Sequence, residues 1–93
     1  MVVGICRLEL GLYENASLKG KRRVIKSIID RVRARYNVSV AEVGGHELWQ
    51  RASLGLAFVS TDSSHVQRVL STVVRFIEAH GEAEVTSSSM ELV

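Results

Sequence analysis

The alternation of hydrophobic and polar residues divides this 93-residue chain into strand-like and helix-like segments. Residues 2–12 repeat with a period of about two, which is typical of a half-buried strand. Residues 38–43 and residues 48–60 show the same period. Gly44-Gly45 marks a turn between these two segments, which are close enough to form a hairpin. Residues 82–92 predict a last strand, although a run of three serines weakens its pattern.

Two other segments repeat with the period of a helix. The first runs from Ser17, whose hydroxyl can cap the free amides of a first turn, to about Tyr36. The second covers residues 63–80, with Asp62 as its cap and Gly81 as its end. The apolar stripes of the two predicted helices are Val24, Ile25, Ile28, Ile29, Val32 and Tyr36 in the first, and Val66, Val69, Leu70, Val73, Phe76 and Ile77 in the second.

The order β-α-β-β-α-β predicts a single α+β domain over residues 1–93, folded as a ferredoxin-like sandwich. Such a fold has a four-stranded antiparallel sheet with both helices on one face. The residues expected to face the helices are Cys6, Leu8, Leu10, Val38, Val40, Leu54, Leu56 and Phe58. The residues expected on the opposite, open face are Ile5, Arg7, Glu9, Trp49, Arg51, Ser53, Gly55 and Ala57.

The composition is that of a soluble globular protein, with 46% hydrophobic and 24% charged residues. No apolar run approaches the roughly 18 residues that a membrane-spanning helix needs. The first ten residues lack the charge pattern of a signal peptide. Cys6 is the only cysteine, so an intramolecular disulfide cannot form. We therefore expect a cytoplasmic protein without a membrane partner.

Positive charge is concentrated in the first predicted helix. Residues 17–36 hold eight of the twelve basic residues and one of the ten acidic residues, in a chain whose net charge is only +2. Most of these cations fall opposite the apolar stripe, so the helix presents a positive surface. Such a surface suits a polyanion such as RNA or a ribosomal particle. The candidate nucleic-acid-binding residues are Lys19, Lys21, Arg22, Arg23, Lys26 and Arg33. The alternative is an ordinary solvated helix face.

Trp49 and Arg51 form a second candidate site, because a tryptophan and an arginine near a strand end are typical anchors of a protein interface. The alternative is that Trp49 covers the rim of the core. The open sheet face carries Ile5 and Ala57 among few charges, so it could pair with a second copy of the chain.

The sequence contains no signature of catalysis, metal binding or a cofactor. The three histidines are far apart, and no spacing of His, Cys or Asp matches a zinc site. A glycine-rich phosphate loop, a nucleophile elbow and paired catalytic carboxylates are likewise missing from the sequence. The sequence therefore favours a protein without enzymatic activity.

Three blocks together resemble the YlxP-like proteins, a family of small bacterial proteins of unknown function. The blocks are SLKxKRRxxKSxxDR from Ser17, NVSVAEVG from Asn37 and LWQRAxLGxAxVS from Leu48. The resemblance extends from Gly4 to about Val85 and implies a ferredoxin-like fold. Genes of this family often lie among those for transcription, translation-initiation and ribosome-maturation factors, which implies work near RNA or the ribosome. The family supplies no catalytic residue.

Three hypotheses follow for the function. The leading one is a non-enzymatic protein that binds structured RNA or a ribosomal surface through its basic helix. The second is a homodimeric interaction module that uses the open sheet face and the rim at Trp49. The third is a small-molecule sensor in the cleft of a ferredoxin-like dimer.

Overall fold

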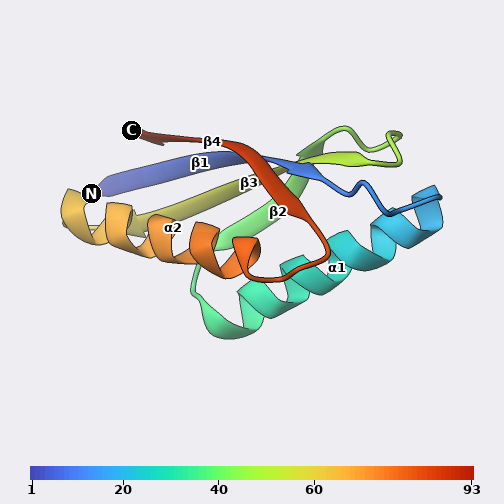
Figure 1. Cartoon of the computed structure of the whole chain (residues 1–93). Helices are drawn as coiled ribbons and strands as arrows, with labels where there is room; N and C mark the ends of the chain where they lie inside the picture. The colour runs from blue at the N-terminus through green and yellow to red at the C-terminus, as the bar shows by residue number, and fades with distance from the viewer.

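The computed structural model describes residues 1–93 as an antiparallel sheet with two helices packed on one face (Figure 1). The elements in chain order are β1 (Val2–Gly11), α1 (Leu18–Arg35), β2 (Ser39–Gly44), β3 (Arg51–Ser60), α2 (Ser63–Glu78) and β4 (Glu84–Leu92). The strands lie in the order β2-β3-β1-β4, and all neighbouring pairs are antiparallel. This arrangement confirms the predicted β-α-β-β-α-β ferredoxin-like sandwich.

The core lies between the sheet and the helices and combines the apolar faces of all the elements, with β4 contributing only the partly buried Val85. In the centre of the sheet Leu8 of β1 stands opposite Leu54 of β3. Helix α2 approaches β1 so closely that a Cβ at Gly4 would lie 2.2 Å from Cγ1 of Val66. Any other residue at this position would force the side chains of Val66 and Leu70 to shift.

Both predicted helix caps are present. The hydroxyl of Ser17 accepts a hydrogen bond from the amide of Gly20 at 3.0 Å, and the carboxylate of Asp62 accepts one from the amide of Ser64 at 3.1 Å. Each cap satisfies an amide that the first turn of a helix leaves without a partner. The short-range sequence signals thus placed both helix starts correctly.

Several predicted boundaries were wrong by two or three residues. Strand β3 begins at Arg51 rather than at residue 48, so Trp49 lies in the loop before the strand. Helix α2 ends at Glu78 instead of residue 80. Phe58 is only half-buried, because it lies towards the end of β3, where its ring meets the ring of His65 edge-on with centroids 5.4 Å apart.

Strand β4 forms despite the serine run that weakened its prediction. It is an edge strand whose side chains are mostly exposed, and it pairs with β1 through the backbone, with Ser88 opposite Leu8. An exposed edge strand needs no apolar alternation, because its main-chain hydrogen bonds carry the pairing. Neither helix is long and apolar enough to cross a membrane.

Candidate nucleic-acid interface

The outer face of α1 presents exposed cations in its N-terminal half. Lys19, Arg22 and Arg23 are exposed, and no hydrogen bond or ion pair within the chain engages their charged groups. Lys26 is also exposed, and its ammonium lies 2.6 Å from the carboxylate of Asp30 one turn later. Such an exposed pair contributes only tenths of a kcal/mol, so Lys26 is readily available to another anion.

Arg33 has a structural contact as well as an exposed position. One guanidinium nitrogen donates a hydrogen bond to the carbonyl of Val40 at 3.0 Å. Val40 belongs to β2, which is an edge strand, and the carbonyls of an edge strand that face away from the sheet can pair with another chain. Arg33 therefore covers the edge of β2, and only its remaining N–H groups are left for a ligand.

Lys21 was predicted to bind nucleic acid, and this prediction is wrong. Its side chain is 0% exposed, so it cannot reach a phosphate. Its ammonium donates to the carbonyls of Gly45 and Arg51, the latter at 3.0 Å, and lies 3.1 Å from the carboxylate of Glu42. A buried charge needs such partners to offset the loss of water. Lys21 thus joins α1 to the end of the β2–β3 hairpin.

The sequence did contain a signal for the burial of Lys21. Lys21 precedes Ile25, Ile28 and Val32 at intervals of four, three and four residues, which is the spacing of one helix face. The same four residues are the buried residues of α1. A lysine in register with an apolar stripe predicts a buried ammonium with acceptors around it, although the acceptors themselves lie far away in the sequence.

The cations at the C-terminal end of α1 are partly used in packing. The guanidinium of Arg35 lies 5.4 Å from the ring centre of Phe76 and 5.9 Å from that of Tyr36. These two rings meet edge-on with centroids 5.4 Å apart. The unengaged positive charge therefore lies mainly in the first half of α1, at the right-hand end of the molecule in Figure 1.

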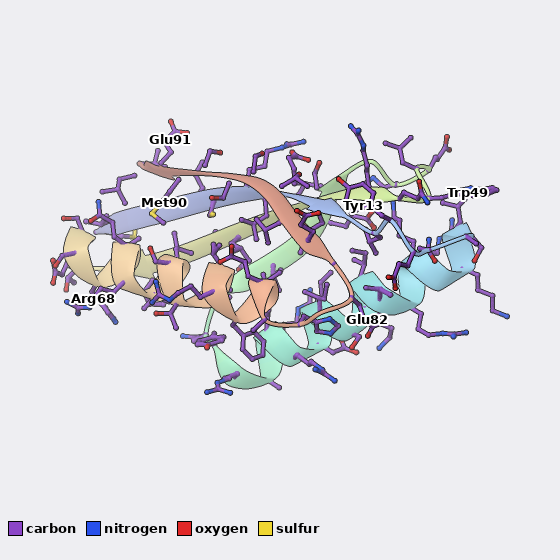
Figure 2. All side chains as sticks on the ribbon, viewed as in Figure 1. Tyr13, Trp49, Arg68, Glu82, Met90 and Glu91 are labelled. Atoms are coloured by element: carbon purple, nitrogen blue, oxygen red, sulfur yellow. The ribbon has the colours of Figure 1, made fainter.

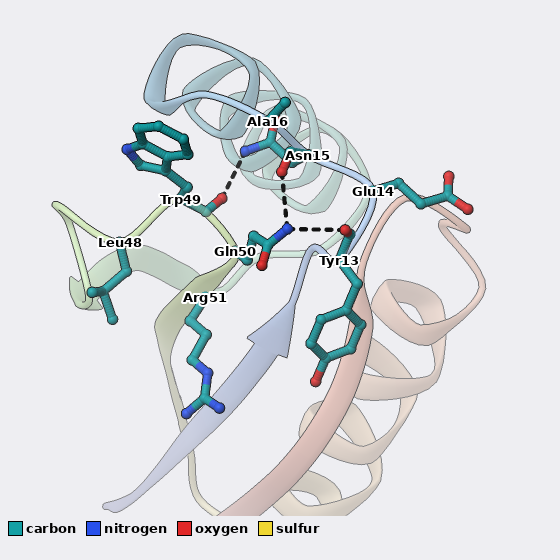
Figure 3. A pocket seen from close by; sticks show the side chains of 8 residues that line it. All are labelled: Tyr13, Glu14, Asn15, Ala16, Leu48, Trp49, Gln50 and Arg51. Carbon is teal, nitrogen blue, oxygen red and sulfur yellow. Dashed lines mark hydrogen bonds between the residues drawn. The ribbon is translucent and has the colours of Figure 1, made fainter.

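Two loops meet at this same end of the molecule, around a shallow depression of about 570 Å³ (Figure 3). The side-chain amide of Asn15 donates at 2.6 Å to the carbonyl of Ser17 and at 2.6 Å to that of Trp49. The side-chain amide of Gln50 donates to the carbonyls of Tyr13 and Asn15 at 3.0 and 3.2 Å. Side-chain amides thus tie the loop after β1 to the loop before β3.

Trp49 and Arg51 both line this depression, but their side chains extend in different directions. Figure 3 shows the indole of Trp49 beside the first turns of α1, whereas the side chain of Arg51 points away from it. Arg51 lies opposite Gly11 in the sheet. The ring of Tyr13 covers Gly11 so closely that a Cβ at position 11 would lie 2.6 Å from the ring. Trp49 is 55% exposed, so it does not cover the core.

The open sheet face combines a polar cluster with exposed apolar residues. Glu9 accepts hydrogen bonds from the Ser53 hydroxyl at 2.5 Å and from Arg7 at 2.9 Å, and these bonds lower the pKa of its carboxyl. Ile5 and Val43 are exposed on this face and border a groove of about 730 Å³. The face therefore has the apolar character predicted for it.

Cys6 is buried in the core, and this burial raises the pKa of its thiol, which disfavours the reactive thiolate. No three side chains of His, Cys, Asp or Glu converge as metal ligands would. The exposed cations and the exposed aromatic side chains are the groups that are available to contact another molecule.

Comparisons with known proteins agree on fold and family. A model of the family described as "Protein of unknown function (DUF503)" matches residues 3–90. The chain is 38% identical over 90 residues to the uncharacterized protein YlxP of Bacillus subtilis (strain 168), an alignment that covers 97% of this chain and 98% of that protein. The solved structure of the de novo designed protein Foldit4 superimposes with a TM-score of 0.51 at 16% identity, covering 100% of this chain and 97% of that one. The last similarity concerns the fold alone. The chain therefore belongs to the DUF503 family of YlxP-like proteins.

Proposed function

We propose that this protein binds structured RNA through the phosphate backbone, using the outer face of the N-terminal half of α1. The observation that carries the proposal is the group of unengaged, exposed cations Lys19, Arg22 and Arg23 on one helix face. Outside residues 17–36, four basic residues stand against nine acidic ones, so the molecule is polarised. A polyanion would be attracted to this one face and repelled by much of the remaining surface.

The geometry favours recognition of shape over recognition of bases. Double-stranded RNA presents its phosphates and 2′-hydroxyls on the surface, while its major groove is too narrow for side chains to read. The exposed cations from Lys19 to Lys26 span about 10 Å of the axis of α1, and their long side chains can reach neighbouring phosphates along an RNA backbone. The open sheet face carries no row of exposed aromatic residues for stacking bases. We therefore propose backbone binding without sequence preference, on ribosomal RNA or a ribosomal particle in the cytoplasm, and no catalytic role.

Reversing two charges on α1 should weaken RNA binding. Arg22→Glu combined with Arg23→Glu is expected to lower the affinity for all RNA sequences alike, because phosphate contacts carry no base information. With three to five phosphates neutralised, the wild-type log–log salt slope should be about −2 to −4.5, and the double variant should flatten it by about 1.4 to 1.8. The measurement is binding to ribosomal RNA and to ribosomal particles across a salt series.

Helix α2 offers a matched control. Arg68 and Arg75 are exposed arginines on that helix, so Arg68→Glu with Arg75→Glu changes the net charge by the same amount. This control should retain most of the wild-type affinity and salt slope. An equal loss in both double variants would show that only net charge matters, and a flat wild-type salt response would show that α1 is merely a solvated surface.

A second candidate function is a homodimeric interaction module, favoured by the exposed apolar residues of the open sheet face. Ile5, Val43 and Val59 are 40%, 48% and 55% exposed there. Burying them against a second copy would remove this apolar area from water. We expect a dimer in light scattering at micromolar concentration, and a monomer after Ile5→Asp with Val43→Asp. A monomeric wild type would exclude the dimer and, with it, a small-molecule sensor in a dimer cleft.

A further inference from the structure

Trp49 is the single tryptophan of the chain, and its side chain is exposed at the end of the molecule where α1 begins (Figure 2). An isolated exposed apolar residue needs no explanation on a flexible surface. Here, however, two side chains from outside the loop donate to three of its carbonyls, and the proposed RNA-binding cations lie on the adjoining helix.

Three carbonyls of the loop that carries Trp49 are bound by side chains from outside it. Lys21 of α1 holds the carbonyls of Gly45 and Arg51, one at each end of the loop. Asn15 holds the carbonyl of Trp49 itself at 2.6 Å. The loop is therefore ordered before any ligand arrives, so a contact made by the indole does not incur the full entropic cost of ordering a loop.

The same contacts fix Trp49 relative to the cationic helix. The amide of Asn15 donates both to Trp49 and to the carbonyl of Ser17, the residue that caps α1. Lys19, Arg22 and Arg23 follow within the next two turns of that helix. The two acids of the adjoining loops are Glu14 and Glu47, and Figure 3 shows Glu14 pointing away from the indole. A flat aromatic ring therefore stands beside the positive half of α1.

A nucleotide matches this combination, because it joins a flat base to a negative phosphate. Stacking on an aromatic side chain tolerates any base, since every base has a π-face. A base inside a duplex is already stacked on its neighbours and cannot lie on Trp49. An apolar segment of another protein could contact the indole, but it would leave the adjacent cations without a partner.

We infer that Trp49 stacks on an unpaired RNA base while α1 contacts the neighbouring phosphates, so that the ligand class is RNA with single-stranded nucleotides next to a duplex. This inference rests on the proposed function and adds to it a preference for junctions over blunt duplexes. The unpaired base would therefore contact the loop before β3 and not the open sheet face.

The test compares two RNA hairpins with the same stem, one blunt and one with a short unpaired 3′ or 5′ tail. The tailed hairpins should bind roughly 5- to 100-fold more tightly in at least one polarity, which corresponds to stacking of one base. Fluorescence should be quenched on binding of the preferred tailed hairpin, and Trp49 is the only tryptophan that can report it. The blunt hairpin should leave the fluorescence nearly unchanged.

Trp49→Ala should abolish the preference for the tail and leave the affinity for the blunt hairpin unchanged, whereas Trp49→Phe should retain most of the preference. Val93→Ala is the control, because Val93 is an exposed apolar residue that pairs with Val3, at the other end of the molecule from the start of α1 (Figure 1). Blunt binding without tail preference or quenching would overturn the inference and leave the proposed function intact. If Trp49→Ala lowered the affinity for both hairpins equally, the inference would also be overturned, because Trp49 would then not contact the unpaired base. If neither hairpin binds, the proposed function fails as well.

Discussion

Replacing Lys21 with methionine is expected to lower the free energy of unfolding by about 3–5 kcal/mol. Methionine has nearly the shape of the lysine stem, so the packing of α1 should survive. The charge is lost, however, and the carbonyls of Gly45 and Arg51 lose their donor, while the largely buried carboxylate of Glu42 loses its cation. Buried polar groups without partners are costly, and an unpaired charge is the most costly of them. Urea denaturation of the purified variant measures the effect.

Two further variants distinguish the stability lost with the buried contacts of Lys21 from the stability lost when any lysine of this helix is replaced. Lys19→Met removes an exposed cation of the same helix and should change stability by less than about 0.5 kcal/mol. Lys21→Met combined with Glu42→Gln should be more stable than Lys21→Met alone, because the second change removes the unpaired carboxylate. A loss below about 1 kcal/mol in Lys21→Met would show that the ammonium does not hold the hairpin to α1.

Replacing Ile28 with alanine should lower the free energy of unfolding by about 2–5 kcal/mol. Ile28 is 1% exposed at the centre of the buried face of α1, among residues from both helices and the sheet. Truncation removes buried methyl and methylene groups and leaves a cavity that the surrounding side chains only partly fill. Urea denaturation again gives the value.

Ile5→Ala is the matched control, since Ile5 is an isoleucine that lies on the open sheet face. It should cost much less, because its side chain is already partly in water. Similar losses at the two positions would contradict the division of the sheet into a core face and an open face. An unexpectedly large loss at Ile5 alone would instead support burial of that face in a dimer.

The order of elements could be predicted from the sequence because the signals that determine it are local. The periods of two and of about 3.6 residues separated strands from helices, and Ser17 and Asp62 marked both helix starts. The two helical crossovers of a β-α-β-β-α-β chain are expected to be right-handed, and this rule left few topologies to consider. Boundaries were less accurate, because the apolar residues Leu48 and Trp49 come just before β3 in the sequence but lie outside the strand.

The candidate interface was predictable only in part. Exposure of Lys19, Arg22 and Arg23 followed from their positions opposite the apolar stripe, so the positive face of α1 was visible in the sequence. The position of Lys21 in the apolar register indicated burial, but its acceptors could not be found in the same way. Gly45 and Arg51 lie 24 and 30 residues away, on either side of a loop that has no repeating pattern.

The sequence by itself therefore determined the fold class, the core faces and the concentration of positive charge on α1, because each depends on residues that are neighbours along one element. Only the tertiary structure decided which acceptors hold the Lys21 ammonium, which carbonyl of β2 Arg33 binds and where the indole of Trp49 lies relative to α1. Asn15 and Trp49 are 34 residues apart in the chain and share a hydrogen bond. Such contacts arise from the packing of separate elements, which local hydrophobic patterns do not encode.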